Sequence, residues 1–322
     1  MDTMSANARD SIVALRNEIG KVVVGQEGTL SGLITALLVR GHVLLEGVPG
    51  VAKTLLVKTL AEALALDYSR VQFTPDLMPS DVTGQLVLDT GSAGSEFRFR
   101  EGPIFTNVFL ADEINRTPPK TQAALLEAME ERQVTAEGKS RPLGDPFLVI
   151  ATQNPIEQEG TYPLPEAQLD RFMFKLLVGY PSHEQEFEIL SRHHSGMDPH
   201  DIKGAGVRPV ATAADLERAR SEVEGVVVEP DVLNYLVAIC RSTRESPSVE
   251  LGVSPRGATA LLHASKAWAW LSGKSFVSPD EIKQVLKPTL RHRLLIRPEL
   301  TIDGVTADGV LDSLMATVPS PR

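Results

Sequence analysis

The segment between residues 47 and 54 constrains the fold of this chain more than any other. It follows the apolar residues 43–45 and leads into a helix-like segment that begins at Leu55. A strand, a glycine-rich turn, a Lys-Thr pair and a helix, in that order, are typical of a phosphate-binding loop. Backbone N–H groups in such a turn bind anions, and the helix N-terminus adds partial positive charge. The predicted loop consists of Gly47, Val48, Pro49, Gly50, Val51, Ala52, Lys53 and Thr54, with Leu55 directly after it.

Three positions of this loop carry specific predictions. Lys53 is expected to reach the β- and γ-phosphates of a nucleotide, and the Thr54 hydroxyl to ligate Mg²⁺. Ala52 stands where the last glycine of the usual pattern would be, and we expect a negative φ there because alanine tolerates a positive φ poorly. An ordinary glycine-rich turn before a lysine is the alternative. The flanking strand and helix favour phosphate binding.

Two acidic residues end a second strand-like segment, residues 107–111. A carboxylate at the carboxyl end of a strand, beside a phosphate loop, can hold the water shell of Mg²⁺, and this is the role predicted for Asp112. Glu113 is the candidate general base for an attacking water. A solvated acid pair at a strand end is the alternative, and the apolar residues before the pair favour the nucleotide role.

A third strand-like segment, residues 147–152, leads to Asn154. An amide at the end of a strand next to Asp112 could orient the hydrolytic water. Asn154 also precedes Pro155, and an Asn-Pro pair more commonly begins a turn. Both interpretations stay open for this residue.

The bulk composition narrows the class of partner. The net charge is −10 and the sequence pI is about 5.3, which excludes a global basic field for nucleic acid or for an anionic membrane. No segment approaches the 18 apolar residues of a membrane span, and residues 1–10 lack a signal-peptide pattern. Cys240, the single cysteine, lies in an apolar helical pattern and is interpreted as a buried thiol in a reducing cytoplasm.

The chain is predicted to form an α/β core followed by helices. Five apolar strands separated by helical patterns indicate a parallel sheet. Residues 85–100 and 133–143 each contain two alternating runs around a glycine-bearing turn, which indicates two β-hairpins. The predicted organisation is a flexible tail (1–10), a nucleotide-binding core (11–194), a linker (195–213) and a small all-helical lid domain (214–322).

The combined motifs resemble the AAA+ ATPases, and specifically the MoxR family. The resemblance rests on residues 110–116, 120–122, 124–129, 131–135, 151–155 and 169–172, together with 251–256 and 290–293 in the helical part. It implies an αβα core with a helical lid, ATP and Mg²⁺ as cofactors, and assembly into a homo-oligomeric ring that is usually hexameric. The hairpins correspond to the helix-2 and pre-sensor insertions of this clade.

The resemblance also implies a role for individual residues. It assigns Lys53 and Thr54 to Walker A, Asp112 and Glu113 to Walker B, and Asn154 to sensor 1. It assigns Arg171 to the arginine finger and Arg256 to sensor 2. The segment that lines the adenine would consist of Val24, Gly25 and Gln26.

The residues themselves support the roles assigned to Arg171 and Arg256 only in part. Arg171 could form a structural ion pair with its neighbour Asp170, and Arg116 and Arg132 are rival fingers. Arg256 begins a helix, where a cation opposes the helix dipole. That cost favours a phosphate-binding role over a solvated arginine.

Three functions fit the sequence. The first is ATP-driven, chaperone-like remodelling of a protein client, such as a metalloenzyme or a complex in assembly, with a separate von Willebrand factor type A domain partner. The second is a nucleic-acid motor, against which the mixed charges of the hairpins argue. The third is a chelatase-type motor subunit, which shares the architecture and differs only in its partner.

Overall fold

A computed structural model describes residues 8–91, 94–136, 138–155, 160–199 and 201–321 of the chain. Its centre is a five-stranded parallel sheet with the strand order β2-β5-β8-β1-β9. The predicted parallel sheet is confirmed, and each expected strand is present. The strands are β1 (Val43–Gly47), β2 (Tyr68–Gln72), β5 (Val108–Asp112), β8 (Leu148–Gln153) and β9 (Phe174–Val178).

Helices cover both faces of the sheet because successive strand residues point to opposite sides. Val43 and Leu45 belong to one buried cluster, which includes residues of α1, α2 and α3. Leu44 belongs to a second cluster, with residues of α5. Strands buried on both faces have continuous apolar sequences, which is why this pattern identified them. The four helices are α1 (Ala8–Gly20), α2 (Glu27–Leu38), α3 (Lys53–Ala63) and α5 (Pro119–Glu131).

The first helix begins earlier than the sequence indicated. Residues 8–10, which were expected in the flexible tail, form the first turn of α1, and Ala8 is buried. Residues 1–7 lie outside the described part of the chain. The apolar side chains of Ile12, Leu15 and Ile19 repeat at a helical period and bury this face of α1 in the core.

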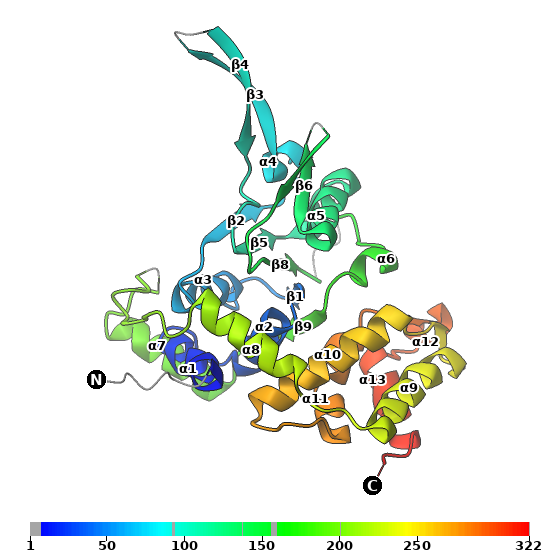
Figure 1. Cartoon of the computed structure of the whole chain (residues 1–322). Helices are drawn as coiled ribbons and strands as arrows, with labels where there is room; N and C mark the ends of the chain where they lie inside the picture. Colours follow the sequence, from blue (N-terminus) through cyan, green and yellow to red (C-terminus); the bar gives the residue numbers. More distant parts are fainter. Residues whose placement is uncertain (1–7, 92–93, 137, 156–159, 200, 322) are drawn as a thin grey trace.

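Both predicted hairpins are present, and Figure 1 shows the first one projecting away from the sheet. It consists of β3 (Gly84–Gly91) and β4 (Gly94–Glu101), and follows the short helix α4 (Pro79–Thr83). The second consists of β6 (Gln133–Ala136) and β7 (Lys139–Pro142). The Arg141 guanidinium lies 4.0 Å above the Phe99 ring, which joins the two hairpins. Turn residues 92, 93 and 137 are outside the described ranges.

The C-terminal part was expected to be entirely helical, but the structure shows two short strands in it. A two-stranded antiparallel sheet, β10 (Val249–Leu251) and β11 (Leu295–Ile296), joins two of its loops. Cys240 is buried there, and burial raises the pKa of its thiol to about 11, as expected for an inert core residue. The helices are α8 (Ala213–Glu224), α9 (Pro230–Glu245), α10 (Pro255–Leu271), α11 (Pro279–Leu290), α12 (Pro298–Ile302) and α13 (Ala307–Thr317).

The segment between the two parts packs against the core. After α6 (Glu166–Leu169) and α7 (His183–His194), the described residues 195–199 and 201–212 contain no helix and lead to α8. The Val210 N–H donates to the Ala63 carbonyl at 2.9 Å, and Val207 and Ala211 are buried. Every helix in the described ranges is too short or too polar to span a lipid bilayer.

Candidate nucleotide-binding site

A cavity of about 710 Å³ opens at the carboxyl ends of β1, β5 and β8. This is the usual ligand position in a parallel α/β sheet, because the strands end together there. The cavity brings together Lys53 and Thr54 from the loop after β1, Asp112 and Glu113 from the end of β5, and Asn154 after β8. It therefore unites residues that lie about a hundred positions apart in the sequence.

The loop backbone differs from the sequence prediction at Ala52. We expected a negative φ, and this was wrong: Ala52 has a φ of 59° and directly precedes the first residue of α3. Gly50 also has a positive φ, 84°, so the chain turns sharply twice before the helix. The left-handed conformation costs alanine roughly 1–2 kcal/mol, and the flanking strand and helix hold it there.

Lys53 is held against the loop that precedes it. Its Nζ donates to the Gly47 carbonyl at 2.5 Å and to the Val48 carbonyl at 3.3 Å. Burial lowers the pKa of Lys53, and the nearby carboxylates of Asp112 and Glu113 raise it in opposition. Gly47 and Val48 thus contribute carbonyl oxygens that position the lysine, while residues 49–55 line the cavity itself.

Polar side chains hold each oxygen of Asp112. Its Oδ1 accepts a hydrogen bond from Thr152 Oγ1 at 2.5 Å, and its Oδ2 accepts one from Arg70 Nη2 at 2.7 Å. Thr152 lies on the neighbouring strand β8, and Arg70 on the other neighbour, β2. The Asp112 side chain is therefore fixed from both sides.

Glu113 is held in a similar way. Its φ is 58°, and its N–H donates to Thr152 Oγ1 at 2.9 Å. Its Oε2 accepts hydrogen bonds from Gln72 Nε2 at 2.6 Å and from Arg116 Nη1 at 3.1 Å. Arg116, considered above as a rival finger, therefore contacts the Glu113 carboxylate of its own chain.

Sequence reasoning missed Arg70, Gln72 and Thr152. A signal for the first two exists, because they lie two positions apart on a strand and therefore on one face. Gln72 lies directly beside Asp112 in the β2-β5 register. Arg70 Nη2 also donates to Gln72 Oε1 at 2.9 Å, so the side chains that hold the two acids contact each other.

Part of the cavity lining is apolar. Val22, Val23 and Val24 contribute to it before α2, and Ile189 and Met197 contribute to it after β9. Sequence reasoning missed α7 as a wall of the cavity, including Arg192 and His193. A cavity that combines apolar side chains with a cationic loop suits a flat base joined to phosphates.

Gly25 and Gln26, which were expected beside Val24, do not line this cavity. Gln26 is buried before the first turn of α2, where its Oε1 accepts a hydrogen bond from Thr29. Gly25 has a φ of 76°, and a Cβ there would lie 2.6 Å from the Gln185 side chain. Both residues shape the turn behind Val24.

The cavity also offers oxygen ligands that fit Mg²⁺. The Asp112 carboxylate and the Thr54 hydroxyl belong to it, and both are hard oxygen donors. In the described residues, no cluster of three or more His, Cys, Asp or Glu could hold a metal ion. One or two protein ligands are typical of Mg²⁺, which takes its other ligands from water and phosphate.

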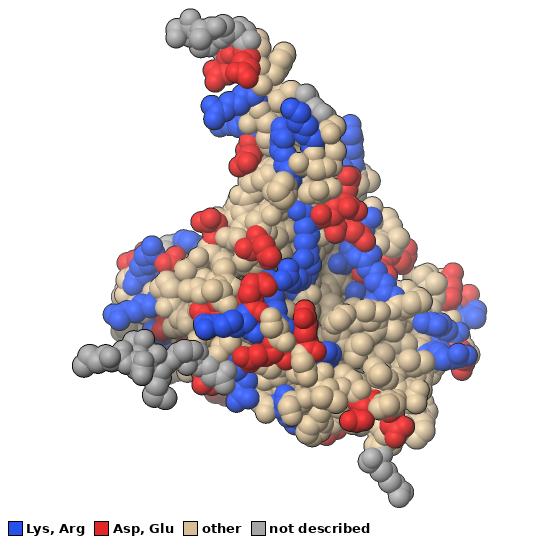
Figure 2. All heavy atoms as spheres, viewed as in Figure 1, with Lys and Arg blue, Asp and Glu red and all other residues tan. Residues whose placement is uncertain are grey.

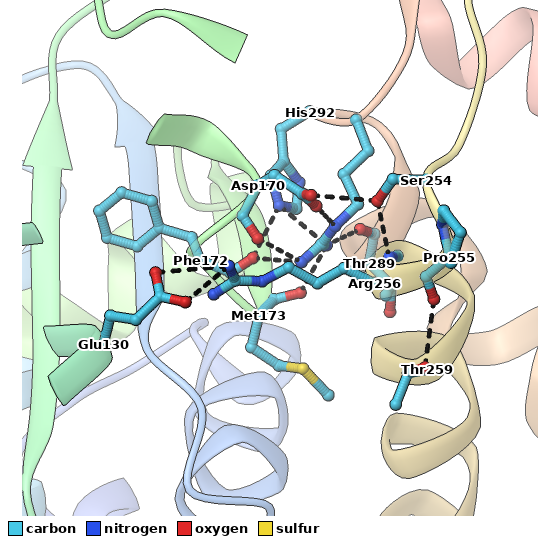
Figure 3. Close-up of polar contacts among 12 residues, drawn as sticks. Glu130, Asp170, Phe172, Met173, Ser254, Pro255, Arg256, Thr259, Thr289 and His292 are labelled. Atoms are coloured by element: carbon cyan, nitrogen blue, oxygen red, sulfur yellow. Dashed lines mark hydrogen bonds and ion pairs between the residues drawn. The ribbon is translucent and has the colours of Figure 1, made fainter. Parts of the chain in front are cut away.

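Arg171 and Arg256 lie in a different place, a hollow of about 210 Å³ that also contains Arg132. Arg171 Nε is 3.1 Å from Glu130 Oε2, and Arg256 Nη1 is 3.0 Å from Glu130 Oε1. Figure 3 shows the Glu130 carboxylate facing Arg256. The structure therefore brings the two predicted arginines together, away from the cavity of their own chain.

Asp170 does not pair with Arg171, which had been the alternative interpretation. Its Oδ1 instead accepts a hydrogen bond from Arg293 Nε at 2.6 Å. Arg132, the other rival finger, donates to the Arg40 carbonyl at 3.3 Å.

Comparison with known proteins agrees with this architecture. The family described as "ATPase family associated with various cellular activities (AAA)" matches residues 42–174, and the AAA lid domain matches residues 241–314. Chaperone MoxR1 of Mycobacterium tuberculosis (strain ATCC 25618 / H37Rv) is 41% identical over 95% of this chain and 81% of its own length. The chain belongs to the MoxR family of AAA+ ATPases.

Two further relatives align with nearly the whole length of this MoxR-family chain. Protein YeaC of Bacillus subtilis (strain 168) is 48% identical over 94% of this chain and 92% of its own length. A crystal structure from Cytophaga hutchinsonii ATCC 33406 has a TM-score of 0.89 and 39% identity, and covers 98% of this chain and 96% of that one. The predicted AAA+ core with a helical lid is thereby confirmed.

Proposed function

We propose that this MoxR-family protein hydrolyses ATP in the presence of Mg²⁺ and uses the reaction to remodel a protein client. One observation carries the proposal: a single cavity gathers Lys53, Asp112, Glu113 and Asn154 together with several apolar side chains. Its volume, about 710 Å³, is within the range of sites that hold a nucleotide-sized ligand. These residues cover charge stabilisation, metal binding, proton acceptance and water orientation.

The residues divide the reaction between them. Lys53 places a positive charge at the β- and γ-phosphates, and Asn154 orients the water. Mg²⁺, held by Thr54 and Asp112, would neutralise charge on the phosphate oxygens. Glu113 takes the proton of the attacking water. Because Gln72 and Arg116 occupy its Oε2, we expect these contacts to loosen before proton transfer.

We further propose that the subunits form a ring, expected to be hexameric, in which the arginines act between chains. Arg171 and Arg256 lie outside the nucleotide cavity of their own chain and share one carboxylate, Glu130. A cation supplied by a neighbouring subunit can stabilise the transition-state charge on the γ-phosphate. This placement supports a role in trans for both arginines.

The first hairpin supports a protein client over nucleic acid. Leu88 and Phe97 lie opposite each other on the hairpin, and their side chains are 53% and 67% exposed. On the face that Figure 2 shows, the projection carries both positive and negative side chains. An exposed apolar pair suits an unfolded or partly folded protein. We propose a von Willebrand factor type A domain protein as the partner, and the cytoplasm as the compartment in which the two proteins meet.

Lys53→Ala is expected to abolish ATP binding, because it removes the charge that faces the β- and γ-phosphates. Equilibrium titration with a fluorescent ATP analogue measures the effect. Lys139→Ala on the second hairpin is the control, since it removes the same charge far from the cavity. Binding by Lys53→Ala as tight as that of the control would contradict the proposed site.

ATP is expected to promote assembly, because a γ-phosphate contacted by Arg171 of the next subunit becomes part of the interface. A ligand that binds the assembled state more tightly shifts the equilibrium toward it by mass action. Sedimentation velocity with and without a non-hydrolysable analogue measures the shift. Lys53→Ala should show no shift, and a monomer in both conditions for the unaltered chain would argue against a ring.

A further inference from the structure

Arg293 joins the C-terminal helices to the segment that carries Arg171. It follows α11, and its side chain is only 3% exposed. Its Nη2 donates to the carbonyl oxygens of Asp170 at 3.1 Å and Phe172 at 2.7 Å. Its Nη1 donates to the carbonyl of Met173 at 3.1 Å and to that of Thr289. With Nε on Asp170, each N–H of the guanidinium has an oxygen acceptor.

These contacts fix backbone as well as side chain. Three of the acceptors are carbonyls of residues 170–173, the stretch between α6 and β9 that contains Arg171. A buried, fully hydrogen-bonded guanidinium permits little freedom, because breaking one bond leaves a polar group unpaired. The position of the Arg171 backbone is therefore set by the end of α11.

Asp170 connects these Arg293 contacts to the start of the helix that carries Arg256. Its Oδ1 accepts from Arg293 Nε at 2.6 Å, and its Oδ2 accepts from Ser254 Oγ at 3.0 Å. Ser254 is the N-cap of α10, and its Oγ also accepts from the Gly257 N–H at 3.1 Å. Figure 3 shows Ser254 and Arg256 at the same end of this helix, with Asp170 beside Ser254. The start of α10 is therefore tied to the residue next to Arg171.

We infer that Arg293 is a positioning residue that, through Asp170 and Ser254, holds Arg171 and Arg256 as one unit. The two arginines meet at Glu130, although their positive charges repel each other. A fixed frame is needed to present both guanidinium groups to the same phosphate. Since α10 and α11 supply this frame, a movement of the C-terminal helices moves both arginines together. The inference rests on the proposed catalytic role of Arg171.

Arg293→Lys tests the inference because it keeps the positive charge and removes the guanidinium group, which donates hydrogen bonds to residues 170–173. We expect kcat to fall about 10²-fold, the size of effect that a displacement of about 1 Å can have, with a much smaller change in KM. Asp170→Asn, which keeps the shape of the joint and weakens both its contacts, should give the same kinetic pattern.

Arg291→Lys is the matched control. Arg291 lies two positions earlier and also binds an acid through Nε and Nη2, since it contacts Asp308 at 3.0 and 2.9 Å. Its third acceptor is the Lys175 carbonyl on β9, outside residues 170–173. Thermal unfolding of all variants measures the structural part of each effect. Arg291→Lys should retain the kcat of the unaltered chain.

Combined variants separate positioning from stability. Because Arg293 is inferred to act through both Arg171 and Arg256, Arg293→Lys should cause no further loss in a chain that already carries Arg171→Ala and Arg256→Ala. Full kcat in Arg293→Lys and Asp170→Asn, or a further loss when Arg293→Lys is added to the other two substitutions, would overturn the inference. Unfolding of both single variants while Arg291→Lys stays folded would also overturn it, by making the joint a requirement of the fold. Full activity of Arg171→Ala would instead refute the proposed finger.

Discussion

Glu113→Gln is expected to bind ATP as tightly as the unaltered chain and to hydrolyse it about 10²- to 10⁴-fold more slowly. The amide has the shape of the carboxylate but cannot accept a proton from the attacking water. Its oxygen can still accept the hydrogen bond from Gln72, so the geometry of the cavity should persist. Equilibrium binding of an ATP analogue and steady-state phosphate release measure the two properties separately.

Glu127→Gln provides the control for this loss of charge. Glu127 is exposed on α5 and lies outside the cavity, so both binding and hydrolysis should stay normal. Normal hydrolysis by Glu113→Gln would show that the general base has been misassigned. If binding persists without turnover, the same variant becomes a means to capture the client in its ATP-bound complex.

The sheet could be predicted because its signals are local. Residues 43–45, 108–111 and 147–151 are apolar without interruption, and only a strand buried on both faces needs such a sequence in so few residues. The acids at the end of β5 and the loop after β1 then follow from topology, because parallel strands end at one edge. Helical periodicity and alternating runs predicted the C-terminal helices and the two hairpins, and the resemblance to the MoxR family identified them as the lid and the insertions.

The remaining features depend on contacts that a linear pattern does not contain. The positive φ of Ala52 is imposed by the way β1 and α3 meet, against the preference of the residue itself. α7 reaches the cavity only because the chain folds back after β9, so Ile189 and His193 carried no sequence signal. Arg293 donates a hydrogen bond to Asp170, although the two residues are more than a hundred positions apart in the sequence. Such pairings follow from packing, which the periodicity of each segment leaves open.

The position of the arginines shows this limit most clearly. Arg171 and Asp170 are neighbours in the sequence, and an ion pair between them was a reasonable alternative. In the structure each contacts a different partner, Glu130 and Arg293 respectively. Because Arg171 does not form an ion pair with Asp170, it is better placed to contact a nucleotide in another subunit. Mixing two inactive variants tests this role.

Lys53→Ala and Arg171→Ala are each expected to be nearly inactive alone and to regain ATPase activity when mixed. Lys53→Ala has a disabled cavity and an intact Arg171, whereas Arg171→Ala has an intact cavity and no finger for its neighbour. A missing finger can cost about 10³-fold or more in hydrolysis. In a mixed ring, some Arg171→Ala cavities face a Lys53→Ala subunit, and those interfaces contain the complete set of residues.

The dependence on mixing ratio distinguishes the finger from a structural role. Activity should peak at an intermediate ratio, because only interfaces between unlike subunits are complete. A purely structural Arg171 predicts no recovery, since the damage would stay within each chain.

Subunits must exchange for the test to operate, and fluorescence transfer between labelled subunits can verify this. Arg171→Ala mixed with the unaltered chain supplies the reference for dilution alone. With exchange verified and no gain at any ratio, Arg171 would have to be abandoned as the finger, and Arg132, in the same hollow, would become the first candidate.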